Sequence, residues 1–310
     1  VIKQGGTDVK AIVRTMLNPD LTAEKRDELI AEIPGIRERY QEAWDIYAPL
    51  PQTPKEAELW EEFVPAWQAW AEENNKVFTL IDKVGEADLG NPTELREKLM
   101  QFQRDHYRVA KNTLQLMVTG DHFEGGDDHH TCAYGRWLNT FETDNPEFRR
   151  MMNDAVDTHR QFHEAVAKIK SLAKDGTKED AQQVLHEELM PAMAETFPRL
   201  EEMEEFAVGV QDIYRQTESL IMGPNFEAQE HANELLDEIV AINETVAHEA
   251  VEAGDAAASS AKAMALGAVV LGVLLAVGFG VFMSRMITKP IKQIVDRIRD
   301  IAQGEGDLTQ

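Results

Sequence analysis

The chain has 310 residues, of which 43% are hydrophobic and 28% are charged, and its formal net charge is −25. The hydrophobic content excludes a chain that is disordered throughout. The acidic excess argues against a nucleic-acid-binding protein, which needs a basic surface. The single cysteine excludes an intrachain disulfide framework and any four-cysteine metal site.

The first strong pattern is a stripe of apolar residues at alternating steps of three and four. Such spacing is typical of the core-facing side of a bundle or coiled-coil helix. We expect Asn74 to be its polar break, and Pro65 to kink the helix or to mark its true start. Core packing is the better interpretation of this tryptophan-rich stripe than a ligand cage. Its members are Trp60, Phe63, Trp67, Trp70, Asn74, Val77, Ile81 and Val84.

Two more helical stripes follow, from Leu200 to Ile221 and from Ala232 to Val246. No stretch alternates convincingly with the two-residue period of a strand. The sequence therefore predicts an all-α protein, an elongated antiparallel helical bundle. Glycine and proline predict the turns between its helices, at residues 50–51, 85–92, 125–126, 175–176 and 223–224.

Four metal-binding side chains stand out between the first and second of these stripes: His106, Cys132, His159 and His163. His159 and His163 are four residues apart, so both imidazoles project from one helix face. Cys132 follows an Asp-rich turn, where the N-terminus of a helix would favour a thiolate. Three imidazoles and one thiolate form a tetrahedral, borderline-soft set that suits zinc.

The spacing of these residues resembles the chemoreceptor zinc-binding domain. Cys-x-x-Gly-x-Trp at residues 132–137 is followed by His-x-x-x-His at residues 159–163, and the resemblance covers residues 100–172. It implies a small helical bundle whose zinc ion is held by Cys132, the two paired histidines and, on the preceding helix, His106. That family is usually found in cytoplasmic proteins, so a copy outside the cytoplasm departs from its pattern.

Interpretations of the same residues that involve no metal are also open. A buried cysteine is usually a small core residue, and a His-x-x-x-His pair recurs by chance in helical proteins. His122, His129 and His130 lie in the segment DHFEGGDDHH. Three interpretations are open for them: a second, weak metal site, a source of an alternative fourth ligand, or an ordinary loop.

Residues 263–284 contain no charged side chain and are bracketed by Lys262 and Arg285. At ~1.5 Å per residue this helix would extend roughly 33 Å, enough to cross the ~30 Å hydrocarbon core of a membrane. Basic residues concentrate on the cytoplasmic side of a membrane. We therefore expect residues 1–262 in the periplasm, residues 263–284 in the inner membrane and residues 285–310 in the cytoplasm, with a first span before residue 1.

The residues after this span resemble the first helix of a HAMP signal-relay domain. The resemblance rests on Pro290, on Gly306-Asp307-Leu308 and on a stripe of isoleucines between them. It implies a homodimer with parallel helices and a second HAMP helix beyond residue 310, so that the chain is a fragment of a longer protein. The stripe consists of Ile291, Ile294, Ile298 and Ile301.

An outer helical domain, a span and a HAMP helix in this order resemble a methyl-accepting chemotaxis protein. Residues 47–67 resemble the second helix of the four-helix-bundle sensor domain of these receptors, which makes residues 1–45 the end of its first helix. The resemblance implies a transmembrane chemoreceptor that relays a small-molecule or metal stimulus to cytoplasmic signalling proteins.

The input half of a membrane histidine kinase or diguanylate cyclase has the same layout and is the alternative. The residues that follow Gln310 would distinguish the two. The chain contains no phosphate-binding loop and no hydrolase motif, and a zinc ion with four protein ligands is of the structural type. We therefore expect no enzymatic activity.

Overall fold

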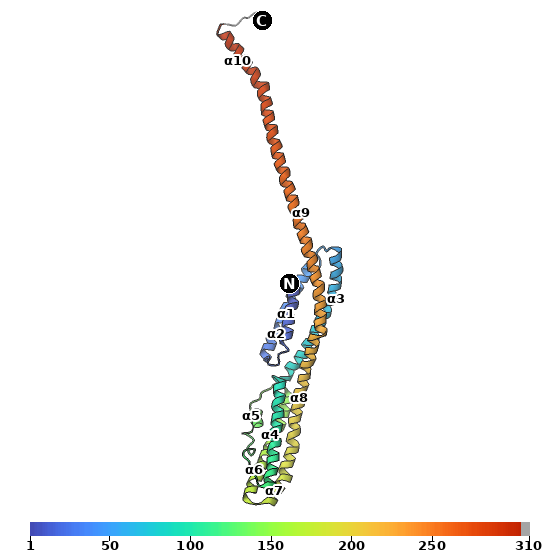
Figure 1. Ribbon diagram of the computed structural model, residues 1–310, viewed down its shortest axis with the longest axis vertical. Coiled ribbons are helices and arrows are strands. Elements are labelled where there is room, and N and C mark those ends of the chain that lie inside the picture. Colours follow the sequence, from blue (N-terminus) through green and yellow to red (C-terminus); the bar gives the residue numbers. More distant parts are fainter. Residues whose placement is uncertain (305–310) are drawn as a thin grey trace. The chain divides into compact units, whose positions relative to one another are not determined.

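The computed structural model describes residues 1–304, with Asp175 described by its backbone alone. Over these residues all regular secondary structure is helical (Figure 1), which confirms the predicted all-α bundle. The elements are α1 (Ile2–Thr15), α2 (Ala23–Tyr47), α3 (Pro54–Ala87), α4 (Pro92–Thr119), α5 (Ala133–Leu138), α6 (Pro146–Asp175), α7 (Lys178–Val184), the π-helical turn η1 (Leu185–Leu189), α8 (Met190–Met222), α9 (Pro224–Met283), the π-helical turn η2 (Ser284–Thr288) and α10 (Lys289–Ala302).

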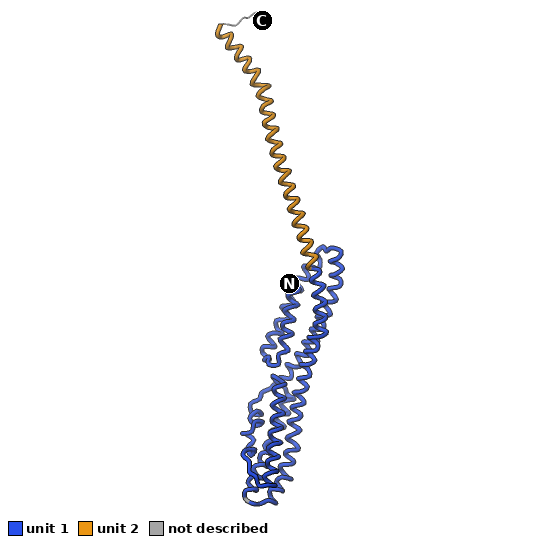
Figure 2. The backbone as a smooth tube through the Cα atoms, in the orientation of Figure 1, with its two compact units in different colours: residues 1–239 blue, residues 240–310 orange. Residues whose placement is uncertain are grey.

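The chain divides into two compact units (Figure 2). Unit 1 comprises residues 1–239 and contains α1 to α8 together with the first part of α9. Unit 2 comprises residues 240–310 and contains the rest of α9 and α10. The residues that predict a metal site all lie in unit 1.

Several helices of unit 1 begin at a capping residue followed by proline, and this fixes where they start. Thr53 accepts a hydrogen bond from the Glu56 backbone (3.3 Å), and the Glu56 carboxylate accepts one from the Thr53 backbone (3.1 Å). The two form a capping box in front of α3. Asn91 and Asn145 cap α4 and α6, and a proline occupies the first position of each helix.

The N-terminal residues form two helices, so the expectation of a single helix over residues 1–45 is wrong. α1 ends at Thr15, and the chain turns at Pro19. Thr22 then starts α2, because its side chain accepts a hydrogen bond from the backbone N–H of Lys25 (3.2 Å). A short turn at Asn18 and Pro19, followed by the Thr22 cap, interrupts the helical pattern.

The tryptophan-rich stripe of α3 is buried as predicted, except for Trp60, which is half-buried. Pro65 does not mark the start of a helix, because it lies inside α3, which continues on both sides of it. Asn74 is 2% exposed, and its amide donates to the Trp70 carbonyl (3.0 Å) while its oxygen accepts from Asn225 Nδ2 of α9 (3.0 Å). A buried amide is tolerated in an apolar stripe because both of its polar groups are paired.

Helices α4, α6 and α8 pack against one another and enclose two apolar clusters. One cluster includes Phe102, Tyr134 and Met203, and the other includes Ala110 and Phe162. Side chains on α4 and α6 contribute to both clusters, so these two helices are held in a fixed register where the clusters meet.

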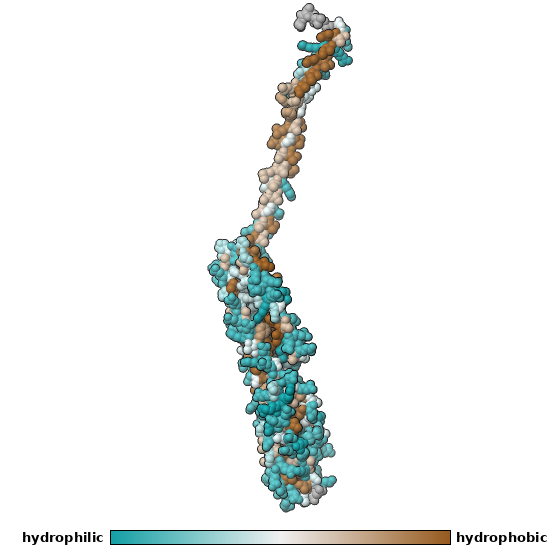
Figure 3. All heavy atoms as spheres, turned by 180° about the vertical axis from the view of Figure 1, so that it is seen from behind, coloured by the Kyte–Doolittle hydropathy of each residue, from teal (hydrophilic) through white to brown (hydrophobic). Residues whose placement is uncertain are grey.

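Unit 2 exposes its apolar side chains, as the brown residues along it in Figure 3 show. Leu271, Leu274 and Phe279 are 58–66% exposed. By length and composition, the helical run Lys178–Ala302 contains a stretch suited to crossing a membrane, and none of that stretch is buried. A water-soluble protein rarely exposes so long an apolar surface.

The isoleucine stripe after the apolar stretch lies on α10. Ile291, Ile294, Ile298 and Ile301 are each more than half exposed. Gly306-Asp307-Leu308, which contributed to the HAMP resemblance, lies outside the described residues.

Candidate metal centre

Three helices of unit 1 bring the four predicted ligand residues together. α4 carries His106, α6 carries His159 and His163, and Cys132 is the N-cap residue of the short helix α5. One ligand atom from each residue lies within 4.8 Å of the ligand atoms of the other three. The three histidines are buried, at 1–3% exposure, and the cysteine is half-buried.

The distances between these atoms fit a single tetrahedral ion. His163 Nε2 lies 3.2 Å from His106 Nε2 and 3.0 Å from His159 Nε2. Cys132 Sγ lies 3.1 Å from His159 Nε2. Bond lengths of ~2.0 Å to nitrogen and ~2.3 Å to sulfur separate neighbouring ligands of a tetrahedral zinc ion by ~3.3 to ~3.6 Å. The three close pairs are slightly shorter than these separations and all pairs lie within 4.8 Å, so small shifts of the side chains would place the four atoms around one ion.

Two backbone carbonyls fix which nitrogen of each ring faces the centre. His106 Nδ1 donates to the Phe102 carbonyl (2.7 Å), and His163 Nδ1 donates to the Gly126 carbonyl (2.9 Å). A carbonyl only accepts, so both Nδ1 atoms must carry hydrogen, and in a neutral ring Nε2 then bears a free lone pair. Metal-binding histidines are held by second partners of this kind.

In these tautomers the Nε2 lone pairs of His106 and His163 point toward each other. The Nε2 atoms of His106 and His163 face each other at 3.2 Å without a hydrogen between them, whichever tautomer His159 adopts. Two acceptors at this distance repel, and a cation between them turns the repulsion into attraction. The donor set therefore fits a metal ion on its own chemistry.

Burial keeps the three imidazoles in their neutral, metal-binding form. It lowers the pKa of His106, and it lowers the pKa of His163 to about 4, although the hydrogen bond to Gly126 opposes this. For His159, burial first and then the neighbouring imidazoles of His106 and His163 lower the pKa to about 2. No proton has to leave these rings before a metal ion binds at neutral pH.

The pKa of Cys132 is shifted in the direction opposite to the thiolate that the sequence predicts. Burial raises the pKa of the Cys132 thiol, although the Gly135 backbone N–H donates to its sulfur (3.1 Å) and opposes the shift. α5 has six residues, so desolvation outweighs the favourable field of its N-terminus. In the metal-free protein Cys132 is a thiol, and a bound cation would bring about the loss of its proton.

The other residues of the Cys-x-x-Gly-x-Trp motif shape the site. A Cβ atom at Gly135 would collide with the His129 carbonyl oxygen and would come within 3.2 Å of the His159 ring, so only glycine fits. Trp137 packs against Tyr134 and Phe102 in one of the apolar clusters. The motif thus contains a candidate ligand at Cys132, a glycine where backbone and ring approach closely, and a tryptophan packed in the core.

The comparisons with known proteins point to signalling. No protein-family model matches the chain, and no solved structure matches it. Over 69 residues the chain is 36% identical to a protein of Acetivibrio thermocellus named "Putative sensory transducer protein". The match covers 22% of this chain and 12% of the length of that relative. Part of this chain is therefore similar to part of a sensory transducer.

The histidines of the loop between α4 and α5 lie outside the four-residue group. His129 is half-buried and His130 is exposed, with ring centroids 3.9 Å apart, and the His129 ring lies 6.2 Å from the His159 ring. His122 is exposed. Sequence patterns did not reveal the carbonyl partners Phe102 and Gly126, because any backbone position offers a carbonyl.

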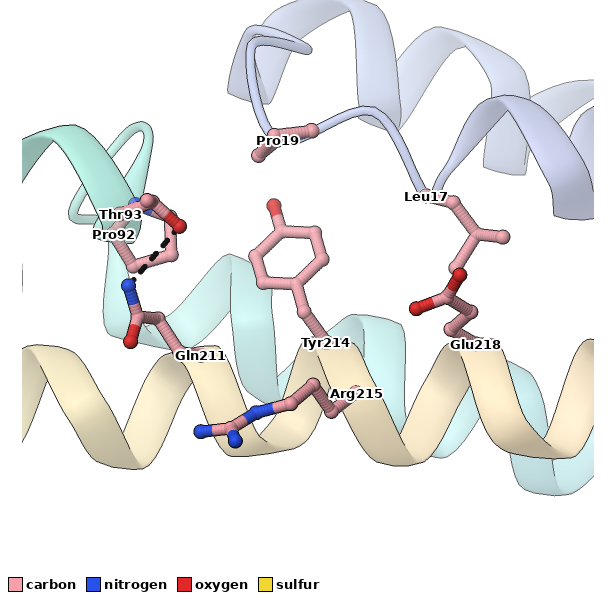
Figure 4. Close-up of a pocket in the computed structure, with 8 residues that line it drawn as sticks. All are labelled: Leu17, Pro19, Pro92, Thr93, Gln211, Tyr214, Arg215 and Glu218. Atoms are coloured by element: carbon pink, nitrogen blue, oxygen red, sulfur yellow. Dashed lines mark hydrogen bonds between the residues drawn. The ribbon is translucent and has the colours of Figure 1, made fainter.

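A separate pocket of about 360 Å³ lies elsewhere in unit 1 (Figure 4). The turn after α1 and the first residues of α4 line it on one side, and α8 lines the other. Within it Gln211 Nε2 donates to Thr93 Oγ1 (3.0 Å), and the Tyr214 ring stands between α8 and Pro19. None of the four clustered residues contributes to this pocket.

Proposed function

We propose that the protein is a zinc-binding transmembrane chemoreceptor of the methyl-accepting type. Residues 1–262 form its periplasmic sensor, residues 263–284 its membrane helix and residues 285–310 the start of a HAMP domain. The observation that carries this proposal is the exposed apolar stretch of unit 2, which follows a helical bundle with a converging set of metal ligands. The similarity to a sensory transducer supports it.

Charge supports the orientation. The residues before Ala263 include 26 basic and 52 acidic side chains, whereas those after Ser284 include five basic and four acidic ones. Lysine and arginine favour the cytoplasmic side of a membrane helix, so residues 285–310 lie in the cytoplasm. The receptor sits in the inner membrane, forms a homodimer and signals to cytoplasmic proteins.

In this proposal zinc stabilises the sensor by linking its helices. His106, Cys132, His159 and His163 hold it, and a closed four-ligand zinc site supplies structural stability rather than hydrolytic chemistry. Because these residues come from α4, α5 and α6, occupancy links three helices and sets their relative positions. A change at the site is then a change in helix packing, the form in which receptors transmit signals.

Reporter fusions within the natural gene test the topology on which the proposal depends. Alkaline phosphatase, which is active only outside the cytoplasm, should be active when fused after Lys262 and inactive when fused after Ala302. A cytoplasmic reporter such as green fluorescent protein should give the reverse pattern at the same two positions. Phosphatase activity at both positions would rule out a membrane helix between them.

A further inference from the structure

The four members of the group are not equally buried. His106, His159 and His163 are buried, at 1–3% exposure, whereas Cys132 is half-buried. Tyr134 and Phe162 close the group from within, because their rings pack against that of His106 with centroids 5.8 and 5.3 Å away. Cys132 is therefore the member of the group nearest to solvent, and we expect an ion to enter there.

His129 and His130 precede Cys132 in the chain by three and two residues. The Cys132 thiol donates to the His129 backbone carbonyl (3.5 Å), so the backbone at His129 lies beside the sulfur. Their rings lie 3.9 Å apart between centroids, and the His129 ring lies 6.2 Å from that of His159. His129 is half-buried and His130 is exposed, so the pair extends from the surface toward His159.

Local hydrogen bonds hold this pair in place. The His130 backbone donates to Asp128 Oδ1 (2.9 Å), and the Thr131 hydroxyl donates to the Asp128 carbonyl (3.2 Å). Arg136 donates to the Thr131 carbonyl and ties the segment to α5. The Asp128 carboxylate is exposed and adds negative charge beside the two rings. Imidazole nitrogen and carboxylate oxygen are both zinc ligands, and negative charge attracts cations.

We propose that His129 and His130 form a surface zinc-acceptor pair that captures Zn²⁺ from solvent and passes it to the buried ligands. This inference rests on the proposed zinc site. Ligand exchange from water to one imidazole and then to the next lets the ion lose its hydration in steps. The pair lies outside the final coordination, so it changes how fast zinc enters and leaves without changing how tightly zinc is held.

The test is the kinetics of zinc exchange in the 310-residue chain, purified in detergent and stripped of metal. Zinc uptake is followed by stopped-flow after mixing with zinc chloride, and zinc release is followed with a coloured chelator. Replacement of both histidines, His129→Asn with His130→Asn, should slow uptake about tenfold, the scale on which local steering affects association. Release should slow by the same factor, leaving the zinc affinity unchanged.

Two further variants make the outcome decisive. His130→Asn alone changes an exposed side chain and should give part of the slowing in a fully folded protein. His122→Asn changes an exposed histidine of the same loop and should exchange zinc at the native rate. Unchanged uptake in the double variant would overturn the acceptor pair while leaving the zinc site intact. Faster release with weaker affinity would instead make His129 a zinc ligand, and a native chain that takes up no zinc would overturn both proposals.

Discussion

The Nε2 atoms of His106 and His163 lie 3.2 Å apart, and both rings donate their Nδ1 hydrogen away from each other to backbone carbonyls. The fold therefore holds two lone pairs face to face in a buried site. Such an arrangement costs free energy in the metal-free protein and becomes favourable when a cation lies between the two nitrogens.

The first prediction concerns metal content and stability. The native chain should carry one zinc ion, and added zinc should raise its free energy of unfolding by about 4 kcal/mol at a thousandfold excess over the dissociation constant. Cys132→Ala and His163→Ala each remove one of four ligands and should lose most of this gain. Metal analysis and thermal unfolding measure both effects. His186→Ala, at an exposed position outside the site, should behave like the native chain. A native chain without zinc and without stabilisation by zinc would make the four residues ordinary packing groups.

The second concerns Gly135. An added Cβ would collide with the His129 carbonyl oxygen and press on the His159 ring, so Gly135→Ala should displace a ligand helix. We expect zinc affinity to fall ~10- to 100-fold, the effect typical of changes next to metal ligands. Gly209→Ala is the matched control, because a Cβ at that position of α8 meets nothing within 4 Å. It should leave zinc affinity unchanged and stabilise the helix by ~0.5–1 kcal/mol. Equal zinc affinity in both variants would contradict the assigned role of Gly135.

The helices of this protein were predictable because their signals are local. The apolar stripes on α3 and α8 have the period of a helix, and both are buried apart from the half-buried Trp60 and Tyr214. The breaks at residues 50–51, 85–92 and 223–224 were visible as glycine and proline, and helices end there. The turn between α1 and α2 was missed, because a single proline with a threonine cap interrupts a pattern that continues on both sides.

The candidate site was predictable in part for the same reason. The spacing of Cys132, His159 and His163 follows from one motif and one helical turn, and the structure brings them together with His106. The raised pKa of the cysteine was not predictable, because it depends on burial by residues distant in the sequence. The role of Gly126 was also hidden. Its positive φ of 82° and its close approach to Val109 appear only in the folded loop.

The third prediction concerns the homodimer. If α10 is a HAMP helix, its isoleucine face lies against the same face of a second chain. Single cysteines at Ile291 or Ile298 should crosslink efficiently between chains in membranes, with the native chain, which has Cys132 alone, as the control for the natural thiol. Cysteines at Gln293 or Asp300, on the opposite face of the same helix, should crosslink weakly. Equal yields on both faces would count against a dimer packed through the isoleucines.

The last prediction concerns pH and the metal-free chain. Burial lowers the pKa of His163 to about 4, and that of His159 further, whereas an exposed histidine titrates near ~6.5. Between pH ~4 and pH ~6.5, His163 is therefore protonated in the unfolded state and neutral in the folded state. The stabilisation is complete above pH ~6.5 and is lost as the pH falls toward the folded-state pKa. For His163 alone the loss is on the order of 3 kcal/mol between these limits.

Urea unfolding in the presence of a chelator, at pH 7.5 and at pH 5, measures this loss. His163→Gln keeps a polar side chain at that position and removes its titration, so the variant should lose less stability than the native chain over the same interval. Carboxylates such as Asp127, whose pKa is lowered chiefly by its hydrogen bond to Lys170, affect stability mainly at lower pH because their unfolded-state pKa is near ~4. If the native chain and His163→Gln lose the same stability between pH 7.5 and pH 5, His163 is not held neutral by burial.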